Sequence, residues 1–294
     1  MTDESYGPTD HGTTHLDHTV GTAGLLTMIS DQLGSRLSHV SPLRGHRQPP
    51  ALVLVAHGSR DPRALATVSA LVERIRERRP GLTVRLGHIE LNEPLLDDTL
   101  AELPAGRAVL VPLLLSRGHH VKHDLPRAAD AAGHLRTRVA DPLGPHPLLV
   151  EALHDRLVEA DWPRRSTDRD RRRGGVVLAA AGSRDPGAAA DVRRTAALLA
   201  DRLGVPVVPG YASAAAPDIA TAARSLAAHG RDRIAVASYF TAPGRFASEA
   251  AAVAPGIAAA PLGTHSALAR LVLHRYDRAP ATAAYADVAR TASV

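Results

Sequence analysis

Cysteine is absent from the 294-residue chain, and aromatic side chains make up only 3% of it. Without cysteine, the protein has no disulfides, thiolate metal sites, iron–sulfur clusters or cysteine nucleophiles. Any metal ion must therefore be bound by histidine, carboxylate or backbone oxygen. So few aromatic residues disfavour nucleic-acid binding by base stacking, and they leave a core of alanine, leucine, valine and isoleucine.

Long hydrophobic runs and a strong net charge are also lacking. No apolar stretch approaches the ~20 residues that span a bilayer, and the acidic start does not resemble a secretory signal. We therefore expect a cytoplasmic protein with no membrane contact. The net charge is +5, and much of the excess lies in the Arg-rich run at 164–173. We interpret this run as a solvated linker, and we expect no nucleic-acid partner.

Apolar strands alternate with amphipathic helices after residue 49. Continuous apolar runs at 51–56 and 108–115 are typical of buried parallel strands, and residues 83–91 and 139–143 predict two more. Helices are expected over 63–79 and 94–103, from about 124 or 126 onward, and over 147–159. This alternation predicts a doubly wound α/β sheet.

The sequence is also internally repeated. Leu54 to Pro62, LVAHGSRDP, recurs as LAAAGSRDP from Leu178 to Pro186, and DPLGPH at 141–146 is matched by APLGTH at 260–265. Two tandem α/β domains of ordinary size explain both matches. We predict an N-terminal tail at 1–48 with a short helix within 20–37, a first half at 49–162, a linker at 163–175 and a second half at 176–294.

The two halves differ in their polar residues. His57 corresponds to Ala181, Glu90 to Ser213, and His120 to Phe246 when Gly118 is matched to Gly244. The first half contains eight histidines between residues 49 and 160, whereas the second contains three between 174 and 294. The first half is therefore expected to carry the chemistry, and the second to be a scaffold.

Three first-half residues are expected at one edge of the sheet. His57 follows the first strand, Glu90 ends the second, and His120 follows the third. The carboxyl ends of parallel strands form the ligand crevice of an open α/β sheet. Two imidazoles and a carboxylate suit a divalent ion such as Fe²⁺, Co²⁺, Ni²⁺ or Zn²⁺. We expect His57 and His120 as metal ligands and Glu90 as a ligand or general base.

Other readings of these residues remain open. Ser59 and Arg60 recur in the second half as Ser183 and Arg184, which favours turn and capping roles. A hydrolase or transferase using His57 and Ser59 is a weaker alternative, because the G-x-S-x-G pattern is absent. The Gly58–Ser59 backbone at a helix start also suits an anion. His146 persists as His265, which favours a structural role for both.

Three segments, AHGSRDP at 56–62, IELNEP at 89–94 and VPLLLSRGHHVKHDLP at 111–126, resemble the sirohydrochlorin chelatase family. These are the small class II cobaltochelatases and ferrochelatases of cobalamin and siroheme synthesis. The resemblance covers residues ~50–280 as two chelatase-like halves, of which the second lacks both histidines. It implies metal ligation by His57 and His120, assisted by Glu90. The pair His119–His120 stands where the family has one histidine, and the register favours His120.

The resemblance also implies the substrates. These are a sirohydrochlorin-type tetrapyrrole and a divalent metal, Co²⁺, Fe²⁺ or Ni²⁺, with no permanently bound cofactor. We expect Ser59, Arg60, Arg117 and Lys122 to bind the carboxylates of the tetrapyrrole. Because two fused copies replace a homodimer, we expect a monomer. The main alternative is a metal chaperone or sensor that uses the same histidines without turnover.

Overall fold

The computed structural model describes residues 48–291, and the predicted tail with its helix lies outside this range. The first half follows the expected strand–helix alternation, since the two central strands of its sheet are mostly apolar runs that are buried on both faces. Its elements are β1 (Ala51–Ala56), α2 (Pro62–Arg78), β2 (Val84–His88), α3 (Leu96–Ala101), β3 (Gly106–Pro112), η1 (His120–Asp124), α4 (Leu125–Ala131), β4 (Leu135–Val139) and α5 (Pro147–Glu159).

The second half repeats this order. Its elements are β5 (Gly174–Ala180), α7 (Pro186–Leu203), β6 (Val207–Tyr211), α8 (Ile219–Ala228), β7 (Arg233–Ser238), α9 (Arg245–Ala252), β8 (Ile257–Ala258) and α10 (Ser266–Thr291). The helix α6 (Asp168–Arg173) precedes β5 and occupies part of the predicted linker. A Thr167–Asp170 capping box begins α6, and Arg173 pairs with Asp232 at 2.8 Å, so the charged run is partly ordered.

Each half contains a four-stranded parallel sheet, in the orders β2-β1-β3-β4 and β6-β5-β7-β8. In the first sheet, α3 and α4 cover one face, and α2 and α10 cover the other. In the second, α8 and α9 cover one face, and α7 and α5 cover the other. Two doubly wound α/β units are therefore confirmed.

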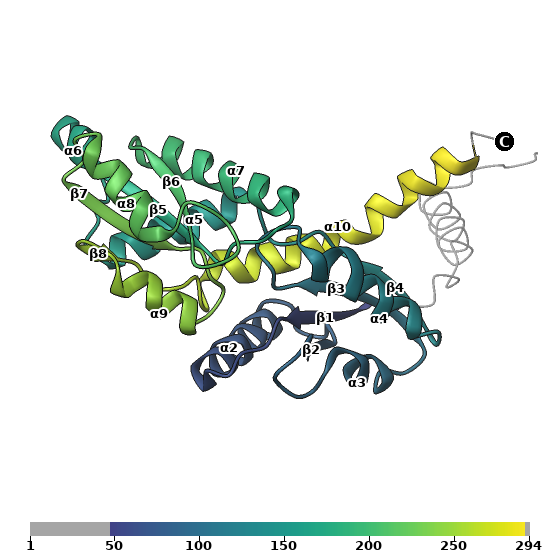
Figure 1. The fold of residues 1–294 in the computed structure, drawn as a ribbon. Helices are drawn as coiled ribbons and strands as arrows, with labels where there is room; N and C mark the ends of the chain where they lie inside the picture. The colour runs from purple at the N-terminus through teal and green to yellow at the C-terminus, as the bar shows by residue number, and fades with distance from the viewer. Residues whose placement is uncertain (1–47, 292–294) are drawn as a thin grey trace, which may run out of the picture. The chain divides into compact units, whose positions relative to one another are not determined.

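The last helix of each half packs against the other half. The first-half helix α5 contacts α7 and β7, whereas the second-half helix α10 contacts α2, β3 and β4 (Figure 1). Leu153 of α5 and Leu271 of α10 are almost fully buried in one continuous apolar cluster that draws on both sheets. Burial of these leucines makes the two halves interdependent, because neither sheet is covered by its own helices alone.

Several element boundaries differ from the predicted ones. The fourth strand is Leu135–Val139, so the prediction of 139–143 was wrong. This edge strand alternates exposed arginines with buried or half-buried residues, and the apolar run that follows it misled the prediction. The second strand ends at His88, which places Glu90 in the following loop. The helix expected over 94–103 is only Leu96–Ala101.

The repeated histidines cap helices. His146 is the N-cap of α5, where its Nδ1 accepts a hydrogen bond of 3.1 Å from the Leu148 amide. His265 does the same before α10, with its Nδ1 3.2 Å from the Ala267 amide nitrogen. Only an unprotonated Nδ1 accepts such a bond. The shared position therefore has a structural explanation, because each histidine begins a helix that packs against the other half.

The His146 cap makes stability depend on pH. Burial, followed by the charges of Arg275 and His274, lowers the pKa of His146 to about 4. The pKa in the unfolded chain is about 6.5, so the folded protein favours the neutral ring. Neutral His146 therefore contributes fully to the free energy of unfolding above pH 6.5, and this contribution is lost as the pH falls towards 4. Because solvent reaches much of the ring, we expect the contribution to be about 1–2 kcal/mol.

The loss of unfolding free energy at low pH is measurable by urea denaturation at several pH values between 7 and 4. The variant His146→Asn retains a capping oxygen but does not titrate, so its stability should decline less over this range. Equal pH dependence of wild type and variant would contradict this role for His146.

Candidate metal-binding site and cleft

The loops after the first three strands meet at the carboxyl edge of the first sheet. His57 directly follows β1, Glu90 lies two residues beyond β2, and His120 begins η1 after β3. Since β1 pairs with both β2 and β3, these three loops are neighbours. The structure therefore brings together the three residues that the sequence singled out.

The rings of His57 and His120 are in edge-on contact. Their centroids are 4.8 Å apart, with an angle of 77° between the ring planes. The ring of His119 lies 6.2 Å from that of His120 and only 4.7 Å from that of His123. The doublet thus places His120 against His57, while His119 turns to its helical neighbour.

A carboxylate faces the Nδ1 atom of each of the two histidines. Nδ1 of His120 is 2.6 Å from Oδ2 of Asp124, and Nδ1 of His57 is 3.5 Å from Oε1 of Glu90. The hydrogen bond with His120 is the largest cause of a lowered pKa at Asp124, so this carboxylate is ionised at neutral pH. An ionised carboxylate only accepts hydrogen bonds. Nδ1 of His120 is therefore the donor, which leaves Nε2 unprotonated in the neutral ring and able to bind a metal.

The sequence pattern predicted Asp124 only as a possible helix start and not as a functional residue. The available signal was its position four residues after His120, because side chains at i and i+4 meet on a helix. Metal-binding histidines commonly donate their second ring N–H to such a carboxylate, which fixes the ring and its tautomer.

Close backbone contacts hold Glu90 beside His57. The Glu90 amide donates to the His57 carbonyl at 3.1 Å, and the Ser59 amide donates to Oδ1 of Asn92 at 2.7 Å. Gly58 has a φ of +101°, and a Cβ there would lie 1.8 Å from the Glu90 carbonyl oxygen. Only glycine fits this position, because it tolerates both the positive φ and the close approach.

Ser59 serves the turn before α2. Its Oγ accepts a hydrogen bond of 3.1 Å from the Asp61 amide, and Asp61 in turn caps α2. Ser183 makes the same 3.1 Å contact with the Asp185 amide in the second half, where no histidine corresponds to His57. The repeated contact favours the turn interpretation of Ser59 over a nucleophile.

A large cavity of about 1260 Å³ extends from the histidines to the second half. Its first-half lining includes His57, Glu90, His120, Ser59 and Arg60. Its second-half lining comes from the loops after β5, β6 and β7 and from the first turns of α7 and α9. Pockets for ordinary small ligands measure about 300–1,000 Å³. This cavity therefore has room for a large ligand that touches both halves.

Apolar side chains gather in the same cavity. Phe240 and Phe246, the only phenylalanines of the chain, both line it. Leu65 and Leu91, two of the four exposed large hydrophobic residues in the described part of the chain, line it as well. The cavity thus combines an imidazole–carboxylate site with apolar surface that suits a flat organic ligand.

The four predicted carboxylate-binding residues fall into two groups. Ser59 and Arg60 line the cavity. Arg117 and Lys122 lie outside its lining, and each pairs with a carboxylate of the second half, Arg117 with Asp191 at 2.6 Å and Lys122 with Asp185 at 2.5 Å.

The histidine pair does not form a complete metal cage. Within residues 48–291, no three His, Cys, Asp or Glu side chains are grouped so as to hold a metal ion. Two imidazoles leave most coordination positions to water or substrate, which is the arrangement of an open site.

Comparison with known proteins identifies the family. The CbiX family model matches residues 51–160 and again residues 175–279. The chain belongs to the CbiX family. The two matches correspond to the two halves, and they account for the internal repeat.

Relatives in this family are sirohydrochlorin chelatases, as the sequence resemblance predicted. The sirohydrochlorin ferrochelatase of Bacillus subtilis is 28% identical over 176 residues, which cover 57% of this chain and 65% of that protein. The sirohydrochlorin cobaltochelatase of Methanococcus aeolicus is 38% identical over 80 residues, 26% of this chain and 56% of that protein. The chain thus spans less than two thirds of either relative.

A third relative has a similar name, and a solved structure shares the fold. The sirohydrochlorin cobaltochelatase of Methanopyrus kandleri is 31% identical over 137 residues, which cover 37% of this chain and 96% of that protein. The structure of SirB from Bacillus subtilis with Fe³⁺ matches with a TM-score of 0.63 at 24% identity, covering 79% of this chain and 95% of that one. The structural match supports the two-half fold.

Removal of the Asp124 carboxylate tests its contact with His120. In Asp124→Ala we expect Co²⁺ affinity to fall about 10–100-fold, because the His120 ring loses the acceptor that fixes its tautomer. The measurement is an anaerobic Co²⁺ titration followed by absorbance. Asp97→Ala, which removes an exposed carboxylate from α3, is the control, and an equal affinity in all three proteins would refute the role of Asp124.

Proposed function

We propose that this protein inserts a divalent metal ion, Co²⁺ or Fe²⁺, into sirohydrochlorin or a closely related tetrapyrrole. The observation that carries the proposal is the contact between the His57 and His120 rings on the wall of a cavity that both halves line. The names of the relatives supply the substrate, and the volume of the cavity suits it.

The metal ion is a substrate that has to be released. In our proposal, Nε2 of His57 and Nε2 of His120 bind it, and the remaining positions are open to the pyrrole nitrogens. Neutral imidazoles bind first-row divalent ions without adding charge to the site. Two protein ligands hold the ion less firmly than four would, so the macrocycle competes for it.

Insertion also releases two pyrrole protons, for which the site offers a base. The exposed Glu90 carboxylate, 3.5 Å from Nδ1 of His57, is placed to accept a proton and to pass it to solvent. Each proton that leaves a pyrrole nitrogen frees a lone pair for the metal, so charge remains balanced as the dication enters the ring.

The rest of the cavity is assigned to the macrocycle. Arg60 and the Gly58–Ser59 backbone are candidates for its carboxylates, because they line the cavity beside His57. Phe240 and Phe246 provide the apolar surface for its flat face. Arg117 and Lys122 are already paired with Asp191 and Asp185, so we assign them a role in positioning the loop that carries His120.

We further propose that the protein acts as a cytoplasmic monomer without a permanently bound cofactor. The second half supplies the cavity wall that a second copy would otherwise provide, which favours a single chain as the working unit. Among residues 48–291, no helix is long and apolar enough to cross a membrane.

Anaerobic absorbance of sirohydrochlorin with Co²⁺, Fe²⁺ or Ni²⁺ tests the activity. We expect the protein to accelerate the spectral change of metal insertion, and the double variant His57→Ala/His120→Ala to lower the rate at least ~100-fold, since direct ligands matter more than their outer partners. His229→Ala, in α8's C-cap of the second half, is the control.

Either of two results would count against the proposal. Insertion at the wild-type rate by the folded double variant would exclude the histidine site. Stoichiometric Co²⁺ binding without turnover of any tetrapyrrole would instead support the chaperone or sensor.

The aromatic wall gives a separate prediction. Phe246→Ala should raise the KM for sirohydrochlorin about tenfold, or about 1.4 kcal/mol, because apolar contact with the macrocycle is lost. Its Co²⁺ affinity should be unchanged. Val253→Ala removes an exposed apolar side chain from the end of the same helix, outside the cavity lining, and should leave KM unaltered. A KM for Phe246→Ala equal to that of this control would refute the role of Phe246.

A further inference from the structure

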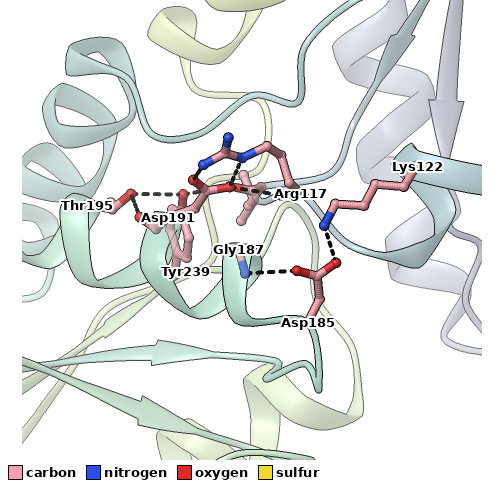
Figure 2. Close-up of polar contacts among 8 residues, drawn as sticks. Arg117, Lys122, Asp185, Gly187, Asp191, Thr195 and Tyr239 are labelled. Atoms are coloured by element: carbon pink, nitrogen blue, oxygen red, sulfur yellow. Dashed lines mark hydrogen bonds and ion pairs between the residues drawn. The ribbon is translucent and has the colours of Figure 1, made fainter.

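We propose that the second half positions the metal-binding loop of the first half through Asp191 and Tyr239. The loop at 115–122 carries His120, so this inference rests on the proposed function. In this proposal both residues act through the loop as positioning residues (Figure 2). Asp191 lies outside the cavity lining, and Tyr239 lines the cavity while its hydroxyl group donates to the loop carbonyl of Leu115.

Asp191 makes three hydrogen bonds to Arg117. Its carboxylate accepts from the Arg117 backbone amide at 2.9 Å, from Nε at 3.0 Å and from Nη2 at 2.6 Å. Asp191 lies on α7 and is only 2% exposed, and a buried carboxylate needs hydrogen-bond partners of this kind. The bidentate ion pair fixes the side chain of Arg117. The hydrogen bond from the Arg117 amide fixes the backbone three residues before His120.

Tyr239 holds the start of the same loop. Its hydroxyl group donates to the Leu115 carbonyl at 3.0 Å and lies 3.2 Å from Oγ1 of Thr195, which in turn donates to the Asp191 carbonyl at 3.0 Å. Tyr239 is 3% exposed, and a buried tyrosine hydroxyl needs such partners. A Cβ on Gly144 would lie 2.2 Å from this hydroxyl oxygen, so glycine leaves room for the bond.

A weaker contact lies on the other side of His120. Nζ of Lys122 is 2.5 Å from Oδ2 of Asp185, whose other oxygen caps α7 by accepting from the Gly187 amide at 2.8 Å (Figure 2). This pair is partly exposed and adds little energy by itself. It does, however, give the loop an attachment to the second half after His120 as well as before it.

These attachments run in one direction only. When the two halves are matched by the registers of β3 and β7, Leu113 is the first-half equivalent of Tyr239. When they are matched by the repeated turn, Thr67 is the first-half equivalent of Asp191. Pro243 stands at the position of Arg117. The half without metal histidines thus holds the residues that fix the loop, while the half with the histidines lacks their counterparts.

Fixing this loop matters because His120 has to meet His57 and the macrocycle in one geometry. Displacement of a catalytic group by about 1 Å costs on the order of 100-fold in rate. The second half therefore contributes to metal transfer although it has lost the ligands. The contribution should be visible in the loop, in bound Co²⁺ and in kcat.

The test compares Asp191→Ala and Tyr239→Phe with Asp277→Ala. Asp277 of α10 pairs at 2.8 Å with Arg79, the C-cap residue of α2, so this control breaks another ion pair between the halves, away from the loop. Three readouts are taken: amide hydrogen exchange of residues 115–122, the Co²⁺ absorption spectrum, and kcat for insertion. Tyr239→Phe removes a single oxygen atom, so it tests the same attachment of the loop if Asp191→Ala does not fold.

We expect faster exchange of residues 115–122, an altered Co²⁺ spectrum and at least a tenfold lower kcat in the two loop variants, with Asp277→Ala like wild type. Asp191→Asn, which keeps an oxygen for the Arg117 amide, should be intermediate. Unchanged exchange in folded Asp191→Ala and Tyr239→Phe, or equal effects in Asp277→Ala, would overturn the inference. Faster exchange with no chelatase activity even in wild type would leave the positioning intact and refute the proposed function.

Discussion

Apolar burial shared between the halves is the constraint on which the rest of this structure depends. The helices α5 and α10 each leave their own sheet and pack against the other half, and their leucines join one cluster that draws on both sheets. Because neither sheet covers itself, the two carboxyl edges are kept together as a unit. That arrangement creates a cavity with a wall from each half, and it allows Asp191 on α7 to reach a loop that follows β3.

The two halves of this chain share one fold but carry different functional residues. Both halves keep the glycine turn after the first strand, with Gly58 and Gly182 each packed against a carbonyl of the neighbouring loop. The first half adds imidazoles to that frame, and the second adds aromatic rings, a buried carboxylate and a buried hydroxyl. The shared Gly58 and Gly182 maintain the turn after the first strand, whereas the differing residues His57, His120, Asp191 and Tyr239 lie at the cavity or at the contact between the halves.

Two histidines whose Nδ1 atoms face carboxylates suit the binding of a metal ion that is later released. Asp124 fixes the tautomer of His120 through Nδ1, and Glu90 stands in the same relation to His57 at a longer distance. Both arrangements direct Nε2 away from the supporting carboxylate. In the proposed function, such a site binds the ion weakly enough to release it, and the surrounding loops, rather than the number of ligands, keep the site rigid.

The sequence by itself determined the strand–helix alternation, the duplication, and the positions of His57, Glu90 and His120 at one sheet edge. These follow from local periodicity and from the rule that parallel strands end together. It misplaced β4, because an edge strand with alternating arginines lacks the apolar signal of a central strand. Only the tertiary structure decided the exchange of α5 and α10 and the partners of Arg117 and Lys122. Those contacts join residues far apart in the chain, so a local sequence pattern does not predict which carboxylate pairs with Arg117 or Lys122.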